Sequence, residues 1–152
     1  MAADVSSQVC RMVALQDLLG AFPNQSGETG DASTASILVG LSTLVPDEVL
    51  QHALQIVDTN GVTCVQSETG RKVFEVRGTK TSHVVLMHGC YCTCLSFSRH
   101  VLGGGLCCKH WLAAQLARRG GRGIGSVSML DDGDFVEWLR QRVTGPSFSS
   151  TW

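Results

Sequence analysis

The chain has 152 residues, of which 43% are hydrophobic, and a formal net charge of −1 at pH 7. This length allows one domain with a modest core, and no apolar run approaches the roughly 18 residues that a membrane-spanning helix needs. Residues 1–10 lack the basic start and the apolar centre of a secretory signal, so we expect a reducing compartment in which cysteines stay free.

The first sixty residues are predicted to form three helices. Apolar residues recur every three or four positions over 8–22, and a second short helix is predicted over 34–43. The small, polar residues at 23–35 between them are predicted to form a mobile linker. A third helix follows Pro46 and ends at the Asn-Gly pair at 60–61.

The periodicity then changes from helical spacing to alternation. Residues 62–67 and 72–77 alternate apolar with polar side chains on either side of a short turn, which predicts a β-hairpin. Residues 83–88 add a third strand, so we expect a three-stranded antiparallel meander that runs directly into a cysteine-rich segment.

Two more helices are predicted beyond that segment. One covers 108–117 and is broken by the Arg-Gly segment 118–123. The other covers about 132–142, with Asp131 or Asp132 as its N-cap.

Charge is distributed unevenly along the chain. Residues 1–75 hold nine acids and three bases, whereas residues 76–130 hold seven Lys and Arg and no Asp or Glu. This basic pole is a candidate surface for an acidic partner or a phosphate backbone. A pole that is neutralised by the protein's own acidic half is an equally good interpretation.

Five of the seven cysteines lie between positions 90 and 108, and such clustering in a reducing compartment indicates metal binding. Cys92 and Cys94 lie two apart in an extended segment, where alternation puts both side chains on one face. Cys108 and His110 lie two apart at the start of a helix, and both can ligate one ion only if the first turn is irregular. Three thiolates and one imidazole predict a single structural zinc site.

Neighbouring residues leave alternatives to this assignment. Cys90 or Cys107 could replace an adjacent ligand, although the two-residue spacing favours Cys92 and Cys108. Ordinary buried thiols without a metal are the competing interpretation. The remaining cysteines and histidines are predicted not to be ligands: Cys10, Cys64, His52, His83, His88 and His100.

Catalysis is not expected. Four protein ligands leave no open position for a metal-bound water. The chain also has no His-Glu-x-x-His motif, no deaminase signature and no phosphate-binding P-loop.

The pattern of C-x-C, a variable loop and C-x-H leading into a helix resembles the SWIM zinc finger. Here it reads CTC at 92–94 and CKH at 108–110. Four segments between about residues 41 and 117 together resemble the small SWIM-domain proteins of the Shu recombination complex: ALQIVD (53–58), SETGRKVFEV (67–76), CYCTCLSF (90–97) and LCCKHWLA (106–113). Leu95 departs from the pattern, since many relatives have proline there.

This resemblance implies a nuclear, non-catalytic protein that acts in homologous recombination and the repair of DNA damage. Such proteins pair with a RecA-like recombinase paralogue and promote assembly of the strand-exchange filament on single-stranded DNA. The alternative is a DNA-binding module in which Arg118, Arg119 and Arg122 contact phosphates directly.

The expected fold class is α+β, with N-terminal helices, a three-stranded antiparallel meander, a SWIM-type ββα zinc module and a C-terminal helix. Three regions are expected. Residues 1–60 form a helical region with its linker, 61–118 hold the meander and the zinc finger, and 119–152 hold the Arg/Gly segment, the last helix and a tail.

Overall fold

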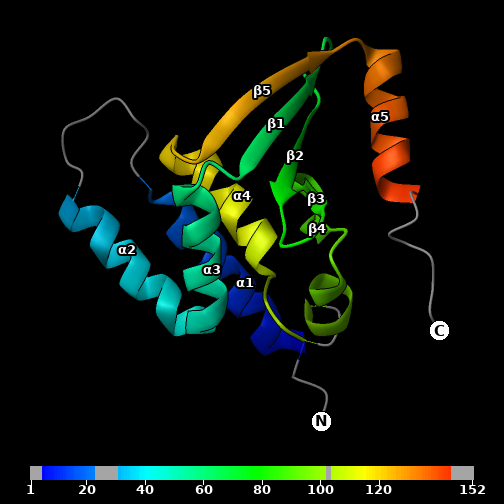
Figure 1. Cartoon of the computed structure of the whole chain (residues 1–152). Helices are drawn as coiled ribbons and strands as arrows, with labels where there is room; N and C mark the ends of the chain where they lie inside the picture. The colour runs from blue at the N-terminus through cyan, green and yellow to red at the C-terminus, as the bar shows by residue number, and fades with distance from the viewer. Residues whose placement is uncertain (1–4, 23–30, 102–103, 145–152) are drawn as a thin grey trace.

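The computed structural model of the protein describes residues 5–22, 31–101 and 104–144 (Figure 1). Within these residues the helices are α1 (Val5–Gly20), α2 (Asp31–Leu44), α3 (Asp47–Asp58), α4 (Lys109–Gly120) and α5 (Asp132–Thr144). The strands are β1 (Val62–Ser67), β2 (Lys72–Arg77), β3 (Ser82–Leu86), β4 (Tyr91–Cys92) and β5 (Ile124–Leu130). None of the described helices is long and apolar enough to cross a membrane.

The strands form one sheet in the order β4-β3-β2-β1-β5. The predicted antiparallel meander is confirmed, because β1 pairs with β2 and β2 with β3. Two strands extend it beyond the prediction: β4 pairs antiparallel with β3, and β5 pairs parallel with β1. Residues 124–130, which follow the Arg-Gly segment, therefore form an edge strand of the same sheet.

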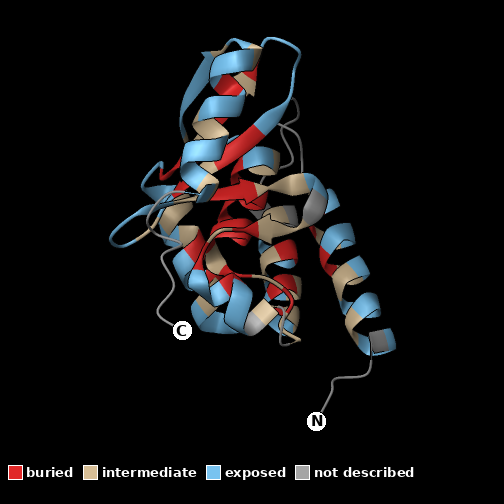
Figure 2. Ribbon diagram, turned by 90° about the vertical axis from the view of Figure 1, so that its right-hand side faces the viewer, coloured by how far each residue is buried: buried red, intermediate tan, exposed pale blue. Residues whose placement is uncertain are grey.

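Helix α4 lies at the centre of the molecule, between one face of the sheet and the N-terminal helices (Figure 1). Every residue from His110 to Ala117 is buried, which explains the buried residues that Figure 2 shows in the middle of the fold. The main core joins Leu15 of α1 and Leu41 of α2 to Trp111 and Leu112 of α4 and to the facing side of the sheet. The α+β class is confirmed by this arrangement.

The opposite face of the sheet carries α5 (Figure 1). Phe135 packs there against Val65 of β1 and Val73 of β2 in a second, smaller core. The backbone N–H of Asp134 donates to Oδ1 of Asp131 at 2.8 Å, so Asp131 is the N-cap. The hydroxyl of Thr69 donates to Oδ1 of Asp132 at 2.8 Å and ties the β1–β2 turn to this helix.

Some helix boundaries differ from those predicted. Helix α1 covers 5–20 rather than 8–22, and α2 begins at residue 31, inside the segment 23–35 that was predicted to be a linker. The small side chains of residues 31–35 (DASTA) suggested a linker, but two of the five are alanine, which has the highest helix propensity. Residues 23–30 of the predicted linker lie outside the described residues.

Candidate metal centre

The four predicted ligands come from the end of the meander and the start of α4. Cys92 is the last residue of β4, opposite Val85 of β3, and Cys94 follows two positions later. Cys108 is the N-cap of α4, and His110 lies in its first turn. The cluster therefore joins the sheet to the central helix.

The structure brings these four side chains together. One ligand atom of each of Cys92, Cys94, Cys108 and His110 lies within 4.8 Å of all the others. A tetrahedral zinc ion with bonds of about 2.0–2.3 Å holds its ligand atoms about 3.5–3.8 Å apart, so side-chain shifts of about 1 Å close the cluster on an ion. All four residues are buried, with exposed fractions of only 2 to 4%.

The start of α4 is irregular in the way that the spacing of Cys108 and His110 requires. Cys108 has φ −95° and ψ 162°, which is extended rather than helical backbone. Its Sγ accepts a hydrogen bond from the backbone N–H of Trp111 at 3.4 Å. Because Cys108 lies outside the helix, its side chain and that of His110 converge instead of pointing apart.

Hydrogen bonds within the cluster favour a thiolate at Cys94. The pKa of Cys94 lies well below its ordinary value because the thiols of Cys108 and Cys92 donate hydrogen bonds to it. The backbone N–H of Phe97 also donates to its Sγ, at 3.2 Å. The pKa of Cys92 is raised by its hydrogen bonds to Cys108 and Cys94 and by burial. The sulfurs of this cluster therefore share protons among themselves through hydrogen bonds, and a bound cation would displace those protons.

The imidazole of His110 gives a separate indication of a ligand. Both Nδ1 and Nε2 are buried and make no well-formed hydrogen bond with the described residues, although the imidazole lies close enough to Cys94 to help lower the pKa of that thiol. Buried polar atoms are nearly always paired, so an unpaired imidazole beside three thiols fits a missing metal bond. Three sulfurs and one nitrogen form the donor set of a borderline ion such as zinc.

The two ambiguous cysteines lie outside this group of four. Cys90 is half-buried in a left-handed backbone conformation with φ 46°. Cys107 is half-buried too, and burial, with the charges of Cys108 and Cys90, raises its pKa to about 12. Neither thiol belongs to the group of four whose ligand atoms converge, so the geometry favours Cys92 and Cys108 over their neighbours.

The other residues predicted not to be ligands are scattered. Cys10 on α1, His52 on α3 and His88 are exposed, and Cys64 is buried in β1. His100 has no described side chain in the structure.

His83 is a neighbour of the cluster that sequence reasoning set aside. Its ring centroid lies 4.4 Å from that of His110. Burial lowers the pKa of His83, and the neighbouring His110 lowers it further. Its place on β3, two residues before Val85 and therefore on the same face, is the signal that could have placed it near Cys92.

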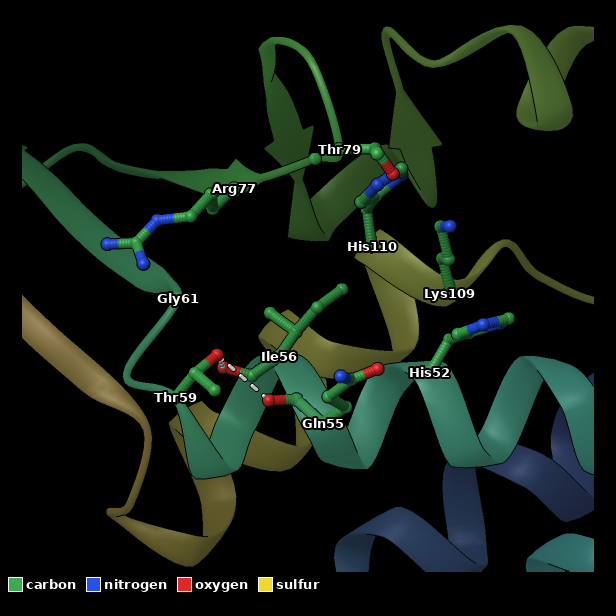
Figure 3. A pocket seen from close by; sticks show the side chains of 10 residues that line it. His52, Gln55, Ile56, Thr59, Gly61, Arg77, Thr79, Lys109 and His110 are labelled. Atoms are coloured by element: carbon green, nitrogen blue, oxygen red, sulfur yellow. Dashed lines mark hydrogen bonds between the residues drawn. The ribbon is translucent and has the colours of Figure 1, made fainter.

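A surface hollow of about 370 Å³ lies beside the cluster. Figure 3 shows it between α3, which contributes His52 and Gln55, and the β2–β3 turn, which contributes Thr79. Lys109 and His110 of α4 form another wall. The buried cluster is therefore separated from this surface by the His110 side chain.

The three arginines of the predicted basic segment do not share one surface. Arg118 is exposed at the sheet side of α4, where it lies with Ile124 along a second hollow. Arg119 is half-buried, and its Nη1 lies 3.6 Å from the place of a Cβ on Gly20 of α1. Arg122 is exposed beyond the end of α4.

Comparison with curated proteins finds relatives over part of the chain. Zinc finger SWIM domain-containing protein 7 of Mus musculus is 35% identical over 91 residues, which cover 51% of this chain and 60% of the relative. The Danio rerio protein of the same name is 43% identical over 70 residues, covering 44% of this chain and 50% of its own length. The Homo sapiens protein is 32% identical over 91 residues, covering 51% and 65%. No family model and no solved structure matches the chain.

Proposed function

We propose that this protein is a non-catalytic zinc-binding subunit in homologous recombination. The proposal rests on the resemblance to SWIM-type zinc finger proteins, which spans about half of the chain and 50 to 65% of the relatives' lengths. It acts in the nucleus, binds a RecA-like recombinase paralogue and promotes assembly of the strand-exchange filament. The partner and the pathway come from the resemblance of residues 41–117 to the small SWIM-domain proteins of the Shu complex.

The observation that carries this proposal is the closed, buried cluster of Cys92, Cys94, Cys108 and His110. Four protein ligands fill the tetrahedral sphere of one zinc ion, so no position remains for a reacting water. Zinc in such a site contributes about 10–16 kcal/mol to folding, which matches or exceeds the whole stability of a typical domain of about 5–15 kcal/mol. The ion is thus a structural element.

Its position explains how a structural ion supports binding. The cluster fixes the start of α4 to the end of the meander, and α4 packs against both α1 and α3. Loss of zinc would therefore loosen the N-terminal helices as well as the finger itself. The zinc site holds a composite surface in shape.

That surface offers apolar side chains for a protein partner. Val9 and Val13 on α1 are 56% and 51% exposed, and Val39 on α2 is 67% exposed. Val9 and Val13 lie one helical turn apart on α1, and exposed apolar side chains on one helix face can anchor a protein partner. Trp138 of α5, a further anchor suggested by its aromatic side chain, is half-buried and packs in the smaller core.

Co-expression with the recombinase paralogue of the same organism tests the proposal. The zinc-loaded chain should co-elute with the paralogue from a gel-filtration column, and the pair should increase filament assembly on single-stranded DNA. His110→Ala should abolish co-elution, whereas His52→Ala, at an exposed position on α3, should preserve it. A zinc-loaded monomer that never co-elutes would contradict the partner assignment.

The alternative function, direct DNA binding through the basic segment, has weaker support. Arg118 is exposed on the sheet side of α4 whereas Arg119 is half-buried beside Gly20 of α1, so the two do not form one continuous exposed surface for a phosphate backbone. Electrophoretic mobility shifts with single-stranded DNA at low and moderate salt test this alternative, because binding through phosphates weakens steeply with salt.

A further inference from the structure

A hollow of about 640 Å³ lies on the face of the sheet that carries α4, beyond the end of that helix. Its floor is apolar and comes from three neighbouring strands, with Cys64 of β1, Phe74 of β2 and Val127 of β5. Lys72 and Arg118 lie at its rim. We call this hollow the distal groove.

The distal groove borders a part of the sheet face, along β5, that α4 leaves uncovered, whereas its floor residues Cys64 and Phe74 are buried. Helices normally cover the apolar face of a sheet, and α4 does so for β1 to β4. The register puts Val127 beside Cys64 and Met129 beside Gln66, on the same face as the groove. Val127 and Met129 are nevertheless 59% and 60% exposed. Val127, which lines the groove, and Met129 beyond it therefore offer exposed apolar surface to a ligand.

Strand β5 pairs with β1 through a register shift at its start, but its sequence lacks the charges and the proline that protect many edge strands. Proteins usually shield such strands with charged residues or proline. The seven residues of β5 include neither, and five of them are exposed. This side of the sheet is therefore suited to contact with a second polypeptide.

The charge of the distal groove restricts what can bind there. Lys72, Arg118, Arg71 and His88 line it, and no Asp or Glu is among the lining residues. The charge of Arg71 helps to lower the pKa of the Asp132 carboxyl, and among the residues that the structure describes no ion pair involves Lys72 or Arg118. A net positive groove on a chain with net charge −1 is complementary to an acidic ligand.

We propose that the distal groove binds a peptide segment of a protein partner in which apolar residues are flanked by Asp or Glu. The apolar residues cover Val127 and the groove floor, and the carboxylates meet Lys72 and Arg118. This proposal does not depend on the partner being a recombinase paralogue. It concerns a surface that the metal centre and the exposed valines of α1 and α2 do not include.

Two other occupants fit the groove less well. Proteins that bind single-stranded DNA stack its bases on accessible aromatic rings, but the aromatic residue of the floor, Phe74, is only 4% exposed. A second copy of the chain, placed symmetrically on this surface, would bring the basic rims of both grooves together. An acidic, apolar segment meets neither difficulty.

The test measures fluorescence anisotropy with the zinc-loaded full chain. The probe is a labelled peptide of about 12 residues, in which three leucines alternate with serines and acidic residues flank both ends. The double variant Lys72→Glu/Arg118→Glu should weaken binding by about tenfold or more, as expected for two reversed, partly exposed contacts. The charge-matched variant Lys80→Glu/Arg99→Glu, at exposed positions outside the groove, should change the affinity for the peptide by less than about twofold.

Further measurements distinguish between the possible ligands of the groove. Replacement of the three leucines of the probe by serine should weaken its binding by about tenfold, because the apolar surface of the groove then stays in contact with water. Melting curves confirm folding of each variant, and Lys72→Gln/Arg118→Gln replaces the reversal if Glu at the end of α4 destabilises the helix. Equal losses in the two double variants, or no peptide binding at all, would overturn the proposal. So would tighter binding of an oligo-dT of equal length that requires Lys72 and Arg118, or a homodimer that dissociates when both are reversed.

Discussion

Removal of the Phe135 side chain should release α5 from the sheet and leave the metal centre intact. Phe135 is 3% exposed and is the buried residue of α5, where it packs against Val65 and Val73. A buried Phe→Ala change costs about 3–5 kcal/mol. An isolated helix of this length is only marginally stable in water, so loss of this contact should also unfold the helix.

Hydrogen exchange over residues 132–144 measures the effect. A loss of about 3 kcal/mol corresponds to more than a hundredfold faster exchange where opening of α5 limits protection. Val136→Ala is the matched control, because this neighbouring side chain on the same helix is 53% exposed and should contribute less than about 0.5 kcal/mol. Unchanged exchange in Phe135→Ala, or loss of metal from that variant, would refute the view that α5 and the metal centre are separate packing units.

Two further predictions concern turns next to the sheet. Gly123→Ala should lower the melting temperature strongly, because residue 123 has φ 86° and a Cβ there would lie 2.7 Å from the backbone oxygen of Val57. Gly70→Ala is the control: with φ 84° and open space around it, this change should cost only about 1–2 kcal/mol of stability. Equal losses of stability in the two variants would contradict this reasoning. The hydrogen bond from Thr69 lowers the pKa of the Asp132 carboxyl, so Thr69→Val should raise that pKa toward its ordinary value in an NMR titration. A lowered carboxyl pKa stabilises the fold fully above the unfolded-state pKa of about 3.9. The stability difference between wild type and Thr69→Val should therefore shrink as the pH falls below that value and through the lower folded-state pKa, and a constant difference would argue against it.

The elements that sequence alone predicted well are those with a local signal. The predicted hairpin strands at 62–67 and 72–77 have the same bounds in the structure. The alternation of apolar and polar side chains and the turn between the strands all lie within sixteen residues, so this signal is local. The four residues that their two-residue spacing marked as ligands also converge in the structure, and their binding of zinc stays a prediction. Their convergence needed only that Cys108 lie outside α4, and the spacing itself imposes that condition.

The features that sequence reasoning missed depend on distant partners. Strand β5 contains Gly125, Ser126 and Ser128, which weaken any strand pattern, and it pairs with β1 about sixty residues earlier in the chain. A parallel pairing across such a distance has no local signal. The contact of His83 with His110 is similar, since it arises only when α4 packs against β3.

The zinc assignment is tested most directly by the metal content of the purified chain and of single variants, measured by native mass spectrometry. One zinc ion per chain is expected, and it should be lost together with folding in four variants: Cys92→Ser, Cys94→Ser, Cys108→Ser and His110→Ala. Cys107→Ser and Cys64→Ser, which change cysteines outside the cluster, should retain the ion. A folded chain without metal, or zinc that survives in Cys108→Ser but is lost in Cys107→Ser, would contradict the assignment.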